Sequence, residues 1–182
     1  AASSGSLQCV KRLLDLGARI DEKDDEGFSA LLRAVVNRHL KCVVILVNRG
    51  ANVNEANNLG STALALAAEH GYTEIVRVLL EAGANIHAKG ISNGDSSLML
   101  AAFNGHIDLV RILLLKGARI NETNKDGDTA LLLAAYEGHQ ECVLTLLEYG
   151  ADKNHKNATG KTALMDAARH GHLETVETLL EF

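Results

Sequence analysis

The chain has 182 residues, of which 47% are hydrophobic and 23% charged, with a formal net charge of −5 and a sequence pI of about 5.9. This composition is typical of a folded soluble protein rather than a disordered one, and the acidic balance with no basic run excludes a surface built to neutralise nucleic-acid phosphates. Because the longest apolar stretches fall far short of the ~20 residues of a membrane span and no signal-peptide pattern opens the chain, we expect an intracellular protein, cytoplasmic or nuclear, with no membrane insertion.

Glycine positions indicate an internal repeat with a period of 33 or 34 residues. One series consists of Gly-Ala pairs that begin at Gly17, Gly50, Gly83, Gly117 and Gly150. A second series, whose members precede segments such as STALALAAEHGY, consists of Gly27, Gly60, Gly94, Gly127 and Gly160. A fixed period of this length predicts a stacked repeat protein, because one unit cannot bury its own apolar face. The extra residue lies between Gly83 and Gly94, in ANIHAKGISNG.

Each period is expected to contain two short helices, whose signals are clear in the unit at 124–156. Thr129 begins the first helix, TALLLAAYEGH, because its hydroxyl can accept a hydrogen bond from a free N–H of the first turn. After a turn at Gly138-His139, ECVLTLLEYGA carries apolar residues at helical spacing and ends at Gly150. The polar segment DKNHKNATGK then predicts an exposed hairpin-like turn to the next unit. Few aromatics and no Pro favour helices packed through Leu, Ala, Val and Ile.

The pattern G-x-T-A-L-x-x-A-A, then G-H, then V-x-x-L-L-x-x-G-A resembles the ankyrin repeat, with Ala and an apolar residue where that family usually has Pro and His. The resemblance covers the whole chain and implies an all-α solenoid of helix-turn-helix units joined by β-turn or hairpin-like loops. The expected units of this single domain are a partial repeat at 1–23, repeats at 24–56, 57–90, 91–123 and 124–156, and a partial repeat at 157–182. Because the chain begins mid-repeat and ends inside a second helix, we expect it to be a fragment of a longer chain.

Three local departures from the pattern are expected to leave this fold intact. Arg38 replaces the glycine between two helices, and Ser96-Ser97 replaces Thr-Ala. The residue inserted near Gly90 should deform one turn. The five in-phase Gly-Ala pairs keep the assignment specific despite these departures.

The segment NATGKTALMDAARHGH, residues 157–172, contains apparent chemical motifs that the repeat explains. Gly160 and Thr162 recur at equivalent positions of other units, and a phosphate-binding loop would need a glycine where His155 stands. Asn157 begins a glycosylation sequon, which matters only in a secretory compartment. We therefore expect no phosphate-binding loop here.

Four histidines share one repeat position, where the ankyrin family uses the imidazole structurally beside the turn between helices: His39, His106, His139 and His172. His170 lies outside this series. Two neighbouring histidines with no third or fourth ligand make a poor zinc site, so we expect no metal.

The three cysteines, Cys9, Cys42 and Cys142, also share one position, on the inward face of the second helix. We expect small apolar core residues that stay reduced, because equivalent positions in stacked helices are roughly 10 Å apart, beyond the ~7 Å Cα separation that a disulfide spans. A catalytic thiol needs exposure and a lowered pKa, and a buried face provides neither.

Function is expected at the positions that differ between repeats. In the ankyrin architecture the turn tips and first helices line a concave groove, and the second helices form the convex back. By this resemblance the groove candidates are Phe28, Asn37, Leu59, Glu69, His70, Asp95, Phe103, Asn104, Lys125, Asp128, Tyr136, Glu137, Lys161, Arg169 and His170. Phe103 and Tyr136 occupy equivalent positions in adjacent repeats, and an exposed aromatic in a polar rim is typical of a binding hot spot. The alternative is that both rings only pack on the neighbouring helix.

The charges of the groove differ between its two ends. The first turn is acidic at 24–26, whereas Lys161 and Arg169 lie in the last unit. Such a gradient either orients a bound peptide or is merely a solvated rim.

We expect a non-catalytic module that binds a protein or peptide in the groove without a cofactor, as a monomer whose exposed ends are able to self-associate. Three alternatives remain open. The first is a targeting or regulatory domain of a larger enzyme or channel. The second is a domain that binds a small ligand, and the third is a substrate for modification. The candidates for asparaginyl hydroxylation, which follow the pattern Gly-Ala-x-x-Asn, are Asn54, Asn121 and Asn154.

Overall fold

The computed structural model of the chain describes residues 1–90 and 93–182. These residues form eleven helices and no strand, and isolated antiparallel bridges join Ala56 to Thr62 and Lys89 to Ser96. The helices are α1 (Leu7–Asp15), α2 (Ala30–Val36), α3 (Leu40–Asn48), α4 (Ala63–Glu69), α5 (Thr73–Glu81), α6 (Ser97–Phe103), α7 (Ile107–Leu115), α8 (Ala130–Glu137), α9 (Gln140–Glu148), α10 (Ala163–His170) and α11 (Leu173–Glu181). The predicted all-α repeat solenoid is confirmed.

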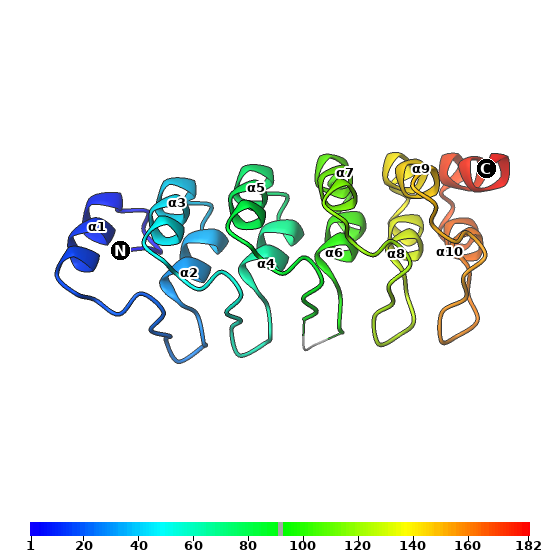
Figure 1. The fold of residues 1–182 in the computed structure, drawn as a ribbon. Helices are drawn as coiled ribbons and strands as arrows, with labels where there is room; N and C mark the ends of the chain where they lie inside the picture. Colours follow the sequence, from blue (N-terminus) through cyan, green and yellow to red (C-terminus); the bar gives the residue numbers. More distant parts are fainter. Residues whose placement is uncertain (91–92) are drawn as a thin grey trace.

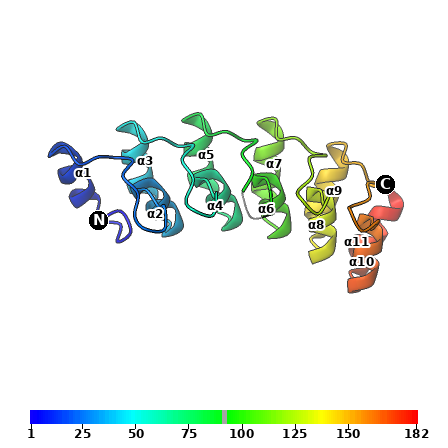
Figure 2. The same cartoon turned by 90° about the horizontal axis from the view of Figure 1, so that it is seen from below.

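The helices stack as a row of pairs (Figure 1). In each pair an inner helix, α2, α4, α6, α8 or α10, contacts the outer helix that follows it, and most helices also contact their counterparts in the neighbouring pairs. The outer helix α1 packs chiefly against α3. Seen from below, the row forms a shallow arch with the inner helices on its concave side (Figure 2).

Hydroxyl side chains begin the inner helices, as the sequence predicts. Oγ1 of Thr129 accepts a hydrogen bond from the backbone N–H of Leu132 at 3.3 Å. The same bond at the other inner helices is formed by Ser29, Thr62, Ser96 and Thr162. The side-chain acceptor satisfies one of the free N–H groups of the first turn. Ser96, which departs from the Thr of the repeat pattern, therefore still caps its helix.

Gly-Ala pairs end the outer helices. At the end of α9, the N–H of Gly150 donates to the carbonyl of Leu147 and that of Ala151 donates to Leu146, both at 2.9 Å. This pair of bonds is the Schellman C-cap, which needs a left-handed residue. Gly150 has a φ of 89°, a conformation that would cost any other residue about 1–2 kcal/mol. The regularity of the Gly-Ala series therefore follows from helix termination.

A ladder of leucines on the outer helices forms much of the core. Leu113 of α7 is fully buried. The equivalent leucines of the other units are also buried: Leu46, Leu79, Leu146 and Leu179. The inner helices contribute fully buried alanines, namely Ala34, Ala67, Ala101, Ala134 and Ala167. Small side chains at these positions allow adjacent inner helices to approach closely.

Histidines link four of the units to the preceding one. Nε2 of His139 hydrogen-bonds the carbonyl of Phe103 at 3.0 Å, across the interface between α6 and α8. Equivalent bonds are formed by His39, His106 and His172. Each of these rings also covers the glycine of the preceding inter-helix turn, so that a Cβ added at Gly105 would lie 2.7 Å from the ring of His139. The predicted structural role of this histidine position agrees with these contacts.

Arg38 and Tyr72 depart from this arrangement together. Arg38 stands where other units have the turn glycine and keeps a left-handed φ of 57°. In the next unit Tyr72 stands where the histidine would cover it, and the guanidinium lies 5.6 Å from the centre of the Tyr72 ring. Since a side chain at the glycine position leaves no room for the covering imidazole, the two exceptions are sterically related.

The turns that precede the inner helices are joined to one another. Backbone N–H groups of one turn donate to carbonyls of the turn before it, from Asn58 to Glu26, from Lys125 to Asn93 and from Ala158 to Asp126. Side chains add further links, because Nδ2 of Asn124 donates to Asp95 at 2.8 Å and Nδ2 of Asn157 donates to Asp128 at 2.7 Å. These bonds join the first two turn tips to each other, and they join the last three turn tips in a second row.

The prediction that all three cysteines lie in the core is wrong for Cys9. Cys42 and Cys142 are buried, whereas Cys9 is exposed. It lies on α1, which packs chiefly against α3 and therefore leaves its other side in solvent. All three are free thiols, as predicted.

The inserted residue near Gly90 falls in a turn whose residues 91–92 lie outside the described part of the chain. On either side of them, the bridge from Lys89 to Ser96 encloses one residue more than the equivalent bridge from Ala56 to Thr62. The N–H of Gly90 donates to the carbonyl of Asp95 at 3.2 Å. The insertion is contained between the bridge partners, and α6 and α7 keep their places in the stack.

Candidate binding groove

The candidate groove residues lie on the turns before the inner helices and at the last turn and C-cap of those helices. The exposed ones are Asn37, Leu59, Glu69, His70, Phe103, Asn104, Lys125, Tyr136, Glu137, Arg169 and His170. The half-buried ones are Phe28, Asp95, Asp128 and Lys161. All belong to the row of inner helices and turns on the concave side of the arch (Figure 2).

Four of these candidates close the inner helices. Nδ2 of Asn37 donates to the carbonyl of Arg33, and Nδ2 of Asn104 donates to that of Leu100, at 2.8 and 2.9 Å. Nδ1 atoms of two histidines, His70 and His170, hydrogen-bond the equivalent carbonyls four residues earlier. Side chains that satisfy the free carbonyls of a helix end have a structural role. This role was not predicted from the sequence, although Asn and His at a helix end are its signal.

Phe103 and Tyr136 remain open to solvent, with 39% and 42% of their surface exposed. Phe103 ends α6 and lines a hollow between helices. Tyr136 lies on α8, where its ring is 4.3 Å from the ring of His170, centre to centre. Both rings therefore combine partial packing with an exposed apolar face.

Two adjoining hollows lie along the inner helices near Phe103. One, of about 320 Å³, is lined by Met99, Leu100 and Phe103 of α6, by Leu133 of α8, and by polar residues that include Glu69. The other, of about 220 Å³, lies toward Leu59 and shares with the first the residues Glu69, Asn93, Asp95 and Leu100. The concave side thus has a continuous depression from the turn tip at Leu59 to Phe103.

The family model for ankyrin repeats (3 copies) matches residues 1–90 and 93–182. The chain belongs to the ankyrin-repeat family. Ankyrin repeats are generally non-catalytic modules of protein–protein interaction. No protein in a search of curated sequences matched the chain.

The first turn of the ankyrin groove is already compensated in charge. Arg33 pairs with Asp24 at 2.7 Å and also with Glu26, and its guanidinium lies 4.2 Å from the centre of the Phe28 ring. The N–H of Phe28, and then Arg33, lower the pKa of Asp24, and the hydrogen bond to Asp24 raises that of Arg33. The positions beside α6 that are equivalent to Glu26, Phe28 and Arg33 are Asn93, Asp95 and Leu100, which line the hollow there.

The middle of the ankyrin groove carries carboxylates that are not compensated in this way. Among the described ranges, 1–90 and 93–182, neither Glu69, Asp95, Asp128 nor Glu137 forms an ion pair. Asp95 and Asp128 each accept one hydrogen bond from an asparagine of the next turn. In the last unit, by contrast, Lys161 lies 3.6 Å from the buried Asp166.

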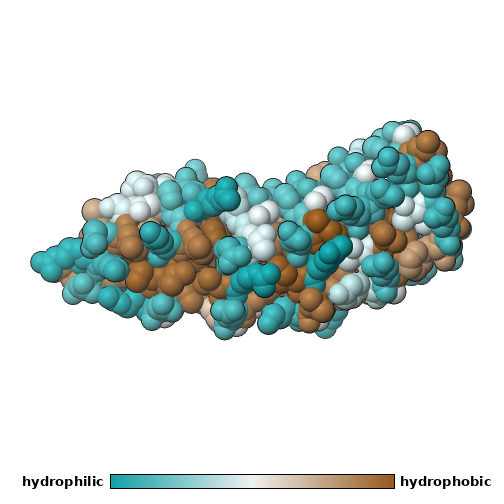
Figure 3. All heavy atoms as spheres, turned by 90° about the horizontal axis from the view of Figure 1, so that it is seen from above, coloured by the Kyte–Doolittle hydropathy of each residue, from teal (hydrophilic) through white to brown (hydrophobic). Residues whose placement is uncertain are grey.

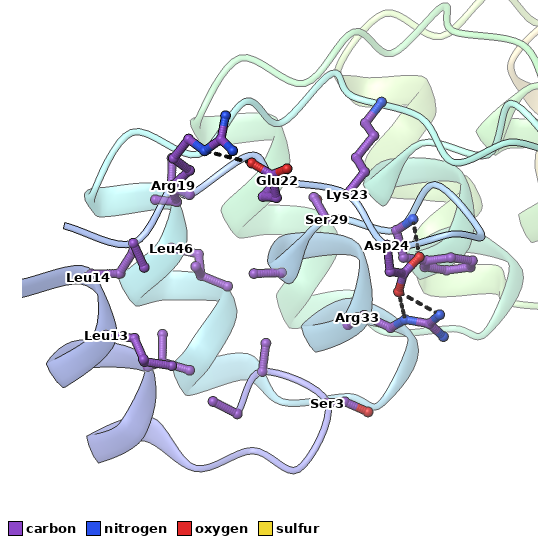
Figure 4. A pocket seen from close by; sticks show the side chains of 17 residues that line it. Ser3, Leu13, Leu14, Arg19, Glu22, Lys23, Asp24, Ser29, Arg33 and Leu46 are labelled. Carbon is purple, nitrogen blue, oxygen red and sulfur yellow. Dashed lines mark hydrogen bonds and ion pairs between the residues drawn. The ribbon is translucent and has the colours of Figure 1, made fainter. Parts of the chain in front are cut away.

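Another hollow, of about 510 Å³, lies beside α1 at the start of the ankyrin array (Figure 4). Its lining includes Leu13 and Leu14 of α1 and Leu46 of α3, with Arg19, Glu22 and Lys23 at its rim. Residues 1–6 align with the end of an inner helix, since Ala1 precedes Ala34 by one period of 33. The hollow therefore lies where the other units place an inner helix, and its apolar lining is that of a repeat interface.

The asparagines proposed for modification lie in exposed loops after the outer helices. Oδ1 of Asn54 accepts from the N–H of Asn85 at 2.7 Å, and Oδ1 of Asn121 accepts from that of Asp152 at 2.9 Å. These two side chains tie successive ankyrin units, and Asn154 lies at the equivalent place. The sequon residue Asn157 is similarly engaged, because its Oδ1 accepts from Thr159 and Lys161.

Other chemical centres are not evident among the described residues. No group of three or more His, Cys, Asp or Glu side chains suited to a metal gathers in that part of the chain. Burial raises the pKa of Cys42, and raises that of Cys142 to about 11. No helix within the described ranges is long and apolar enough to cross a membrane.

The face seen from above, toward which the outer helices lie, mixes hydrophilic surface with apolar patches (Figure 3).

Proposed function

We propose that the chain binds a segment of a partner protein in the concave groove, with Phe103 and Tyr136 as its main contacts. The observation that carries this proposal is the exposure of both rings at equivalent positions of α6 and α8, with Phe103 lining the depression along α4, α6 and α8. Exposed aromatic side chains on a rigid framework are the usual anchors of protein interfaces.

The spacing of the two rings suits an extended segment. They end the equivalent turns of adjacent inner helices, which pack at roughly 10 Å. Three residues of extended chain span about the same distance. One partner segment can therefore contact both rings along the groove.

The test compares binding and stability of Phe103→Ala and Tyr136→Ala. Ligands are selected from a library of ten-residue peptides displayed on phage, and their dissociation constants are measured by calorimetry. Each substitution should weaken binding by ~2 kcal/mol, about thirtyfold, as central aromatic anchors do. The free energy of unfolding should fall by less than ~1 kcal/mol, because neither ring fills a closed core.

Leu115→Ala is the matched control, since Leu115 is an exposed apolar residue on the outer helix α7. It should leave binding unchanged. A large loss of stability in Phe103→Ala and Tyr136→Ala, with unaltered affinity of the folded fraction, would instead show that the rings only pack on their neighbours.

A further inference from the structure

The two hollows beside α6 share one wall and open to the same groove. That wall consists of Leu100 with Glu69, Asn93 and Asp95. Their volumes, about 320 and 220 Å³, lie at or below the lower end of the range for sites that enclose a whole small molecule. Open hollows of this size suit single side chains of a longer segment.

The larger hollow is apolar at its floor. Met99 is buried, Leu100 and Leu133 are half-buried, and the exposed Phe103 also lines the hollow. An aliphatic side chain placed here would remove its own surface and that of Phe103 from water, at roughly 25 cal/mol for each Å² of apolar area.

The shared wall carries negative charge that no described residue balances by an ion pair. Glu69 is exposed at the end of α4, and Asp95 retains one oxygen beyond the one that accepts from Asn124. The equivalent region of the first turn differs, because Arg33 there supplies a cation to Asp24 and Glu26. A partner cation in the middle of the groove would be attracted to Glu69 and Asp95, to which no described residue supplies a cation by an ion pair.

We propose that the depression between α4 and α6 binds an extended basic segment of a partner protein, with an aliphatic side chain over Phe103 and a Lys or Arg between Glu69 and Asp95. Side chains two apart in an extended chain point to the same side, so the two groups occupy positions i and i+2. This inference rests on the proposed function and adds the chemistry of the partner.

The probe is the same phage-displayed library of ten-residue peptides, selected on the protein and on a variant with Glu69→Gln and Asp95→Asn. The second substitution keeps Oδ1 as an acceptor for Asn124. A control variant, Glu141→Gln with Glu177→Gln, removes the same number of charges from exposed positions on the outer helices α9 and α11. Peptides that bind are resynthesised and measured at 20 mM and 300 mM salt.

Selection on the protein and on the control should enrich sequences with an aliphatic residue two positions from Lys or Arg, and selection on the groove variant should lose the basic preference. Each single substitution, Glu69→Gln or Asp95→Asn, should weaken a selected peptide about three- to fivefold at low salt, as for an exposed ion pair, and less at high salt.

Neutral or acidic peptides that still require Phe103 would overturn this inference and leave the proposed function standing. Basic peptides that bind the groove variant and the control alike would also overturn it. Failure to select any peptide that requires Phe103 or Tyr136 would count against both proposals.

Discussion

Replacing Tyr72 with histidine tests the steric relation between successive units. A Cβ added at Gly5, Gly71, Gly105 or Gly138 would lie between 2.5 and 2.8 Å from an atom of the histidine ring of the next unit. Arg38 already has such a Cβ, so an imidazole introduced by Tyr72→His cannot take its usual place. The substitution also removes the contact between Arg38 and the tyrosine ring, worth about 0.5–1 kcal/mol at an exposed site. We expect Tyr72→His to lower the free energy of unfolding by about 1–2 kcal/mol.

A second substitution, Arg38→Gly, should change how Tyr72→His affects stability. When residue 38 is already glycine, Tyr72→His should raise the free energy of unfolding rather than lower it. On its own, Arg38→Gly relieves a left-handed conformation worth about 1–2 kcal/mol, but it loses the contact with Tyr72 and adds about 0.5–1 kcal/mol of backbone entropy to the unfolded chain, so it should be near neutral. In the double variant the imidazole is free to hydrogen-bond the carbonyl of Val36, which gains about 1 kcal/mol. The coupling energy between the two substitutions should be about 2 kcal/mol, favouring the Gly–His pair.

Urea unfolding of the four proteins, followed by far-UV circular dichroism, measures this coupling. Tyr149→His, at an exposed tyrosine after α9, controls for the change of residue type. Additive effects within about 0.5 kcal/mol, or a Tyr72→His variant as stable as the parent, would refute the steric argument.

Three further predictions concern stability and reactivity. Leu113→Ala should cost about 2–5 kcal/mol in urea unfolding, because it empties a fully buried site in the middle of the array; a cost below about 1 kcal/mol would contradict the packing of the core. Hydrogen exchange measured by mass spectrometry should be fastest at 1–16 and 173–182, since terminal units have one stacking interface, and uniform protection would oppose this. N-ethylmaleimide at pH 8 should modify Cys9 quickly and Cys142 slowly, because burial raises the pKa of Cys142 to about 11 and keeps its thiol protonated; equal rates would be inconsistent with the fold.

The fold could be predicted in detail because its determinants are local and repeat. A glycine that must be left-handed, such as Gly150, and a hydroxyl that must cap a helix, such as Thr129, leave the same mark in every unit. The inward position of Leu113 follows from the same period. Cys9 shows the limit of this argument, because an equivalent position is buried only where neighbouring helices cover it.

The groove was less predictable, because its surface depends on which side chains satisfy one another. The sequence identifies Asn37 and Asn104 as variable groove positions, but not that both bond helix carbonyls. It shows Arg33 as one more charge, whereas in three dimensions the guanidinium pairs with Asp24 and Glu26 and lies over the ring of Phe28. On α6 the equivalent position is Leu100, an apolar residue that lines the depression beside Phe103.

Turn-to-turn hydrogen bonds, from Asn58 to Glu26 at one end and from Lys125 to Asn93 and Ala158 to Asp126 at the other, preorganise the turns that border the groove. The tips that these bonds join are held relative to one another before any partner arrives, so association need not immobilise them. The loss of backbone conformational entropy on binding then falls mainly on the partner segment. Affinity should accordingly improve most when that segment is itself constrained to an extended shape, for example by cyclisation, rather than when the repeats are stabilised further.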